Sequence, residues 1–165
     1  MIQLKSLLNC IDNSGASVVE CVNVLKKKRA ATIGDRIVVV VQKQRAAGSE
    51  GTGTTLANKV RRGDIRHAVI VRVKKELQRV DGTVVRFGDN ACVLVNKSGD
   101  PIGTRMNGAC FESLSSRGPM ARGIGKSLAT EIATSSNADT FPGVVGQELR
   151  GKQWSKILSL APVHV

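Results

Sequence analysis

The sequence predicts a mainly β protein, built as a small antiparallel barrel or sandwich. Six short runs rich in valine and isoleucine fill the first two-thirds of the 165 residues. Clusters of glycine, aspartate and asparagine separate these runs, and breakers at such short intervals are typical of strands joined by tight turns. A chain of this length forms one ordinary domain with a single core. We therefore expect one domain over residues 1–165.

The expected strands are residues 7–11, 17–25, 36–43, 67–74, 84–87 and 91–96. The turn signals between them are residues 12–15, 34–35, 63–64, 81–82, 88–90 and 98–101. Asp81-Gly82 lies between two short β-prone segments and predicts a hairpin, because the type I′ turn that suits a hairpin requires positive φ. Gly48–Gly53 is interpreted as a flexible loop tip.

The composition changes after about residue 108. Residues 113–146 are rich in serine, glycine, threonine and alanine and show no sustained periodicity. Their apolar content is too low for a core, so they are predicted to be an insertion rather than a second domain. Leucine, tryptophan and isoleucine recur at mixed helical spacing over residues 147–158, which predicts a short helix there.

The charge is concentrated in one part of the chain. The protein has 25 Lys+Arg against 13 Asp+Glu, a net charge of +12. Residues 26–79 hold fifteen basic and four acidic residues, and so contribute +11 of that total. Such an excess predicts a polyanionic partner, with nucleic acid first and an anionic membrane surface second. The longest apolar run, Ile37–Val41, is far shorter than a bilayer span of ~20 residues, so no membrane span is expected.

Scarce aromatic residues narrow the nucleic-acid hypothesis. The chain has three phenylalanines, one tryptophan and no tyrosine. Proteins that bind single strands stack successive bases on aromatic side chains, and this chain has too few for such a platform. The charge pattern therefore favours contact with the phosphates of folded nucleic acid.

The cysteines and histidines do not indicate a metal site. Cys10, Cys21, Cys92 and Cys110 form no C-x-x-C pair, and the chain has only two histidines. Free thiols in a reducing compartment are expected, because no secretory signal precedes them.

Nothing in the sequence favours an enzyme. Gly123-Ile-Gly125-Lys126-Ser127 is similar to the end of a phosphate-binding loop, but Met120 stands where that motif needs glycine. Asp12, Asp35 and Asp64 each lie in a turn signal, and a turn-forming role explains them better than acid–base catalysis. A nucleotide-dependent enzyme that uses Lys126 and Ser127 is the weaker alternative. We expect no catalytic residues, no metal and no cofactor.

Residues 68–94 carry a more specific pattern: Ala68-Val69-Ile70-Val71, Asp81-Gly82, Phe87, Asn90 and Val93-Leu94. This spacing resembles the signature of the universal large-subunit ribosomal protein fourteen family. Further matches in family order extend the resemblance over residues 1–108 and 145–165. It implies a five-stranded β-barrel with a protruding β-ribbon and short C-terminal helices.

The resemblance also implies a function. Members are structural constituents of the large ribosomal subunit that bind large-subunit rRNA and contact small-subunit rRNA in an intersubunit bridge. Ribosomal proteins three and nineteen, and the ribosome silencing factor, are the expected protein partners. The alternative is an RNA-binding barrel that associates with ribosomes only transiently, as a translation factor does.

The candidate rRNA-binding residues combine the basic cluster with the resemblance, which puts those from Lys43 to Arg62 on or near the ribbon and its loop. They are Lys26, Lys27, Lys28, Arg29, Lys43, Arg45, Lys59, Arg61, Arg62, Arg66, Arg72, Lys74, Lys75, Arg79, Arg86 and Arg105.

Two differences from the bacterial members of this family indicate the cellular compartment in which the protein works. Residues 48–58 replace a compact, more basic loop, and the insertion at about residues 109–144 is atypical of the family. The motifs are nevertheless closer to the bacterial form than to the eukaryotic cytosolic one. Together these features predict a mitochondrial member that works in the mitochondrial ribosome of the matrix, with bacterial cytoplasm or a plastid as alternatives. Lys5, Asp12 and Glu20 interrupt the N-terminal apolar residues, so an internal or uncleaved import signal is expected.

Overall fold

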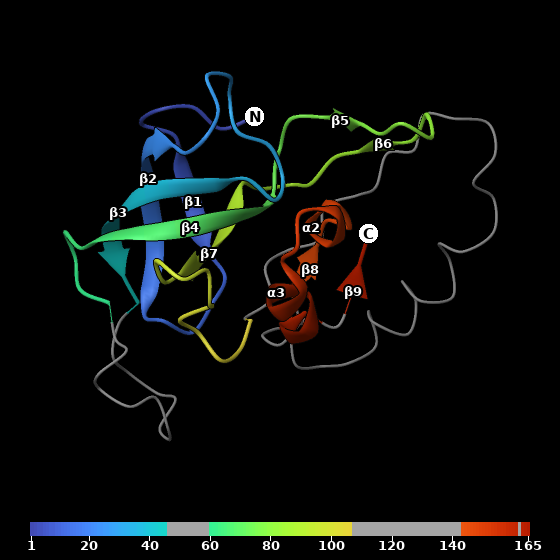
Figure 1. Cartoon of the computed structure of the whole chain (residues 1–165). Helices are drawn as coiled ribbons and strands as arrows, with labels where there is room; N and C mark the ends of the chain where they lie inside the picture. The colour runs from blue at the N-terminus through green and yellow to red at the C-terminus, as the bar shows by residue number, and fades with distance from the viewer. Residues whose placement is uncertain (46–59, 107–142, 162) are drawn as a thin grey trace.

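A closed five-stranded barrel forms the centre of the computed structural model, which describes residues 1–45, 60–106, 143–161 and 163–165 (Figure 1). The elements in chain order are β1 (Leu7–Cys10), β2 (Ala16–Val24), β3 (Arg36–Gln44), β4 (Ile65–Arg72), β5 (Leu77–Gln78), β6 (Val84–Val85), β7 (Ala91–Val95), β8 (Val144–Val145), α2 (Glu148–Gly151), α3 (Ser155–Leu160) and β9 (Val163–His164). The prediction of a mainly β protein with a five-stranded barrel is confirmed.

The barrel has the strand order β1-β2-β3-β4-β7. Neighbouring strands are antiparallel, except that β7 closes the barrel by pairing in parallel with β1, where Cys10 lies opposite Cys92. Closure gives every barrel strand two neighbours, so no barrel edge is left unpaired.

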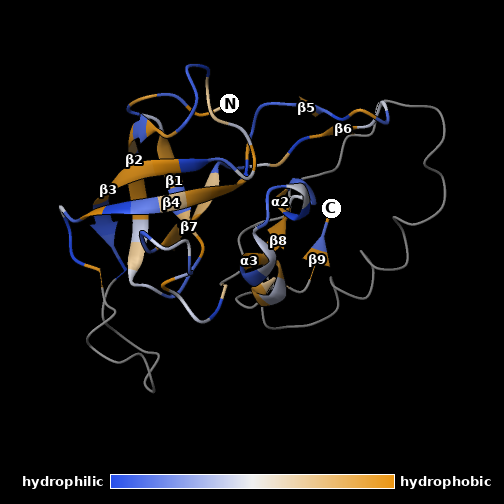
Figure 2. Cartoon of the chain, in the orientation of Figure 1, coloured by the Kyte–Doolittle hydropathy of each residue, from blue (hydrophilic) through white to orange (hydrophobic). Residues whose placement is uncertain are grey.

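The core follows from the alternation of side chains along the strands. In β3, Ile37, Val39 and Val41 are fully buried, whereas the residues between them are half-buried. All five residues of β7 are buried, as are Ala68–Arg72 of β4. Strand β4 is covered on both faces, because the C-terminal segment packs outside it, where Gly146 donates a backbone hydrogen bond of 3.2 Å to Val71. Figure 2 shows hydrophobic residues on the barrel strands and largely hydrophilic residues in the β2–β3 loop.

Aspartate carboxylates hold the turns, as the sequence predicted, and that of Asp12 is buried. The carboxylate of Asp12 is 1 % exposed and accepts hydrogen bonds from the backbone of Ser14 at 3.0 Å and of Leu94 at 2.7 Å. Asp64 accepts a backbone hydrogen bond of 3.1 Å from Arg61 in the turn before β4. These carboxylates satisfy backbone donors that the turns would otherwise leave unpaired.

Strands β5 and β6 form a ribbon that projects from the barrel (Figure 1). The predicted hairpin at Asp81-Gly82 is confirmed, but its turn differs from type I′. Only Gly82 has positive φ, at +82°, and its N–H donates to the Arg79 oxygen at 3.1 Å. The loop is therefore three residues long, with glycine in the left-handed position. The expectation that residues from Lys43 to Arg62 lie on or near a ribbon and its loop stays a prediction, because residues 46–59 lie outside the described part of the chain.

The C-terminal segment contains two short helices where the sequence predicted one over residues 147–158. Helix α2 ends because Gln153 adopts a left-handed φ of +64° and Trp154 is also non-helical. Strands β8 and β9 pair in parallel beside the helices. Of the predicted insertion at 109–144, residues 109–142 lie outside the described part, and Val144 belongs to β8. No helix in the described ranges is long and apolar enough to cross a bilayer.

Candidate nucleic-acid interface

The barrel topology divides the basic segment between two opposite ends. The loop from β2 to β3 and the residues after β4 lie at the end from which the ribbon projects, which we call the ribbon end. The turn from β1 to β2, the link from β3 to β4 and the residues after β7 lie at the opposite end. Successive antiparallel strands reverse direction, so cations that are near in sequence alternate between ends. The sequence had indicated a single basic cluster.

Six candidate cations are exposed at the ribbon end: Lys26, Lys27, Lys28, Arg29, Lys74 and Lys75. The first four belong to the loop after β2, where Lys26 has a φ of +59°. Lys75 lies close to the N-terminal segment. Burial lowers the pKa of the Met1 amine, and the positive charge of Lys75 lowers it further.

One of these cations is already held by a carboxylate. Lys27 Nζ lies 2.6 Å from Asp35 Oδ2, and Lys152 Nζ lies 2.7 Å from Asp35 Oδ1. Thr32 also donates its backbone N–H to Asp35 at 2.8 Å. Burial alone would raise the pKa of the Asp35 carboxyl, but the hydrogen bonds from Lys152 and Lys27 outweigh it and lower that pKa. Lys152 is far away in the sequence, and no local pattern points to this contact.

The two arginines of the ribbon differ in what they contact. Arg79 is half-buried, with Nε 2.6 Å from Glu148 Oε1 and a second nitrogen donating to the Val165 oxygen at 2.7 Å. It therefore ties the ribbon to the C-terminal segment. Arg86 is exposed and lies 3.9 Å from Glu76, a distance at which an exposed pair contributes little.

The opposite end carries a second group of exposed candidates, Lys43, Arg61, Arg62, Arg66 and Arg105. Arg105 is placed beside the first turn, because its oxygen accepts a hydrogen bond of 3.2 Å from the backbone of Asn13.

A further candidate lies at the same end. Arg45 is half-buried and folds onto the barrel, where its guanidinium donates to the Cys10 oxygen at 2.8 Å. Lys59 lies outside the described residues.

Arg72 is the candidate that the structure removes from the surface. It is 2 % exposed, and its Nε lies 3.1 Å from Asp89 Oδ1. Its position at the end of β4 is covered on both faces, so the guanidinium is neutralised inside the protein instead of reaching solvent. From the sequence, Arg72 was indistinguishable from its exposed neighbours.

Nine candidate cations are exposed and form no ion pair with another described residue: Lys26, Lys28, Arg29, Lys43, Arg61, Arg62, Lys74, Lys75 and Arg105. The described part of the chain contains no group of acidic, histidine or cysteine residues suited to a metal, and Cys10, Cys21 and Cys92 are free thiols. A surface of this kind can bind anions through charge and hydrogen bonds, with long side chains that reach phosphate oxygens.

The described part of the chain is thus a closed barrel with exposed, unpaired cations at both of its ends. Residues 1–133 match the model of a family described as ribosomal protein L14p/L23e. A large ribosomal subunit protein uL14m from Neurospora crassa is 56% identical over 165 residues, covering 99% of each chain. The large ribosomal subunit protein uL14m from Schizosaccharomyces pombe is 44% identical over 162 residues, covering 98% of each chain. The chain belongs to the ribosomal protein L14p/L23e family.

Family membership confirms several sequence predictions. The chain is a ribosomal protein and not an enzyme, and its relatives place it among the mitochondrial members of the family. Both alignments extend over nearly the whole of each chain, so these relatives have a length close to that of this chain. The resemblance read from residues 68–94 identified the same family.

Proposed function

We propose that the chain is a structural constituent of the mitochondrial large ribosomal subunit and binds rRNA through cations at both ends of its barrel. The observation that carries this proposal is the division of exposed, unpaired cations between the ribbon end and the opposite end. Each end can bind a separate stretch of phosphate backbone, whereas a single basic face would bind only one.

The barrel suits such a role mechanically. Its strands form a continuous cylinder, and the cations lie near strand ends and in the connecting segments, of which the β2–β3 loop is held by buried Asp35. Phosphate contacts made from a rigid support fix a protein in position without reading sequence. The protein would thus hold two rRNA segments at a fixed spacing.

We further propose that the chain contributes to an intersubunit bridge. The C-terminal segment, with α2 and α3, lies outside β4 and leaves the cations of the opposite end uncovered. We expect large-subunit rRNA to bind the basic ends and the C-terminal segment to face small-subunit rRNA. Contacts with ribosomal proteins three and nineteen, and with the ribosome silencing factor, stay predictions from the family resemblance.

Sedimentation of purified mitochondrial ribosomes tests the proposal. A structural constituent is expected to remain with large-subunit rRNA through a high-salt gradient, at one copy per subunit. A factor that associates only transiently would be released at modest salt and found in sub-stoichiometric amounts, and that result would overturn the proposal. Hydroxyl-radical cleavage of rRNA from probes attached at Lys28 and at Arg62 then tests the two ends. Cleavage of two separate rRNA segments is expected, and cleavage from one position only would exclude two-ended binding.

A further inference from the structure

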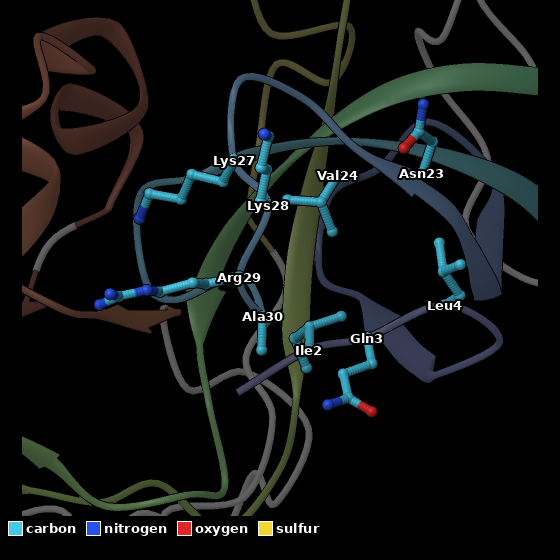
Figure 3. A pocket seen from close by; sticks show the side chains of 9 residues that line it. All are labelled: Ile2, Gln3, Leu4, Asn23, Val24, Lys27, Lys28, Arg29 and Ala30. Atoms are coloured by element: carbon cyan, nitrogen blue, oxygen red, sulfur yellow. The ribbon is translucent and has the colours of Figure 1, made fainter.

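A hollow opens at the ribbon end between the N-terminal segment and the loop that joins β2 to β3 (Figure 3). Its volume is about 420 Å³, within the range of sites that hold small organic molecules. The backbones of Ile2 and Ala31 exchange two hydrogen bonds of 2.8 Å, which hold the two walls together. The hollow is therefore present without any ligand to shape it.

The lining combines an apolar floor with amide groups. Ile2, Val24 and Ala30 are buried or half-buried and supply the floor. Gln3 and Asn23 are exposed at its margin, and neither side-chain amide makes a hydrogen bond to another described residue. An amide both donates and accepts hydrogen bonds, which is the combination needed to pair with the edge of a nucleobase.

Two cations border the same hollow. Lys28 and Arg29 are exposed and have no carboxylate partner among the described residues. Lys27 also lines the hollow, but Asp35 holds its ammonium group at 2.6 Å. Figure 3 shows Arg29 on one side of the hollow, with Asn23 and Leu4 on the other. A planar guanidinium matches the geometry of phosphate oxygens, so Arg29 is suited to a phosphate beside the hollow.

We propose that this hollow binds one unstacked nucleotide of an RNA strand. The base lies on the apolar floor, with the amides of Gln3 and Asn23 at opposite margins of the hollow, and its phosphate lies on the side of Lys28 and Arg29. This inference rests on the proposed function, because rRNA must reach the ribbon end for one of its nucleotides to enter.

Titration of the ¹⁵N-labelled full chain tests the site. Three probes separate the parts of a nucleotide: adenosine 5′-monophosphate, ribose 5-phosphate without the base, and adenosine without the phosphate. The complete nucleotide is expected to shift the amide signals of Gln3, Asn23 and Arg29, and each truncated probe to bind about tenfold more weakly. An RNA hexamer is expected to shift the same signals at lower concentration and to displace the mononucleotide, as required if the natural ligand is part of an RNA strand. A hexamer that left the mononucleotide in place would contradict the RNA assignment.

Matched variants locate the binding. Arg29→Gln is expected to weaken nucleotide binding about tenfold, and Asn23→Ala about fivefold, because each removes one hydrogen-bonding group. Lys97→Gln removes one positive charge at the opposite end, from an exposed residue that is not among the candidate rRNA contacts, and is expected to leave nucleotide binding unchanged. The α-helix and β-sheet signals in circular dichroism check that each variant is folded.

Two results would overturn the inference. Equal affinity for ribose 5-phosphate and the mononucleotide would show a bare anion site, and an equal loss of affinity in Lys97→Gln and Arg29→Gln would show non-specific attraction. Binding of an rRNA fragment measured on the same samples keeps the two proposals apart. Absence of nucleotide binding in the wild-type chain, with rRNA binding intact, rejects only the hollow, whereas absence of rRNA binding in the wild-type chain rejects the proposed function.

Discussion

The indole of Trp154 donates a hydrogen bond of 2.9 Å to the backbone oxygen of Gly34, 120 residues earlier in the chain. This contact joins the C-terminal helices to the turn that precedes β3. Lys152 reinforces it by donating to the Ile33 oxygen and to Asp35, each at 2.7 Å. The turn between residues 32 and 35 is therefore the point at which the C-terminal segment is fixed to the barrel.

Replacing Trp154 by phenylalanine tests that hydrogen bond. The variant keeps an aromatic ring beside Gly99 but leaves the Gly34 oxygen without its donor. We expect a loss of about 1–2 kcal/mol in the free energy of unfolding. Trp154→Ala also removes ring packing and should cost about 3 kcal/mol. Urea denaturation followed by circular dichroism measures both, and a phenylalanine variant as stable as the wild type would show that the bond contributes nothing.

The glycine at position 34 is required by two features of the turn. Its φ is +78°, and an added Cβ would lie 2.7 Å from Lys152 Cδ. Gly63 has a similar φ of +88° but open space around it, so Gly63→Ala serves as the matched control. In both alanine variants, backbone strain should lower the free energy of unfolding by about 1 kcal/mol. In Gly34→Ala the free energy of unfolding should fall by about a further 1 kcal/mol, because Lys152 must move. Equal losses would show that Lys152 yields without cost.

The lowered pKa of Asp35 predicts how stability depends on pH. The folded state binds a proton to Asp35 less readily than the unfolded state, so protonation favours unfolding. The stabilisation is complete above the unfolded pKa of about 3.9 and is lost as the pH falls through the lower folded value. Asp35→Asn should cost about 2 kcal/mol at neutral pH, because Lys27 and Lys152 lose their counter-charge.

Denaturation at a series of pH values checks this prediction. The difference in unfolding free energy between Asp35→Asn and the wild type should shrink at the acid end of the series. A difference that stays constant from pH 7 down to pH 3 would show that the ionised form of Asp35 is not the source of the stabilisation.

Replacing the exposed Arg61 and Arg62 should change RNA binding, whereas replacing the buried Arg72 should change stability. Arg61→Ala with Arg62→Ala should reduce the slope of log affinity for rRNA against log salt by roughly two, about one for each lost phosphate contact. Arg72→Gln should leave that slope unchanged and instead lower stability by about 3 kcal/mol, since it leaves Asp89 without its partner. Filter binding at several salt concentrations, alongside denaturation, measures both. An unchanged slope in the double variant would mean that Arg61 and Arg62 face solvent in the complex.

The thiols inside the barrel should be unreactive in the folded protein. A hydrogen bond with Cys92, followed by burial, raises the pKa of the Cys10 thiol, and burial raises that of Cys21. Thiolate is the reactive form, so alkylation by iodoacetamide at pH 8 should be slower in the native state than in urea by on the order of a hundredfold. Mass spectrometry of the peptides gives the rates for each cysteine. Rapid native modification of Cys10 would mean that the barrel opens between β1 and β7.

Much of the fold could be predicted because its signals are local. The valine-rich runs of β2, β3, β4 and β7 and the turn residues between them depend on spacing of a few residues, and the structure places strands there. The turn roles of Asp12, Asp35 and Asp64 were also correct, because a side chain that bonds a backbone two or three residues away leaves a mark in the sequence. The short C-terminal helices implied by the resemblance are confirmed, but spacing alone predicted one helix over residues 147–158, because the left-handed φ of Gln153 that separates α2 from α3 is not visible in the hydrophobic pattern.

By itself the sequence determined the strand content, the approximate turns, the family and the concentration of positive charge in residues 26–79, because hydrophobic period, turn chemistry and local charge are properties of neighbouring residues. Only the tertiary structure decided which cations are available. It buries Arg72 against Asp89, uses Arg79 to hold Glu148, and occupies Lys27 with Asp35. It also divides one basic stretch between two ends of the barrel. The physical reason is that ion pairs and burial depend on contacts between residues tens of positions apart. Closure of the barrel creates these contacts, and residue spacing along the chain does not reveal them.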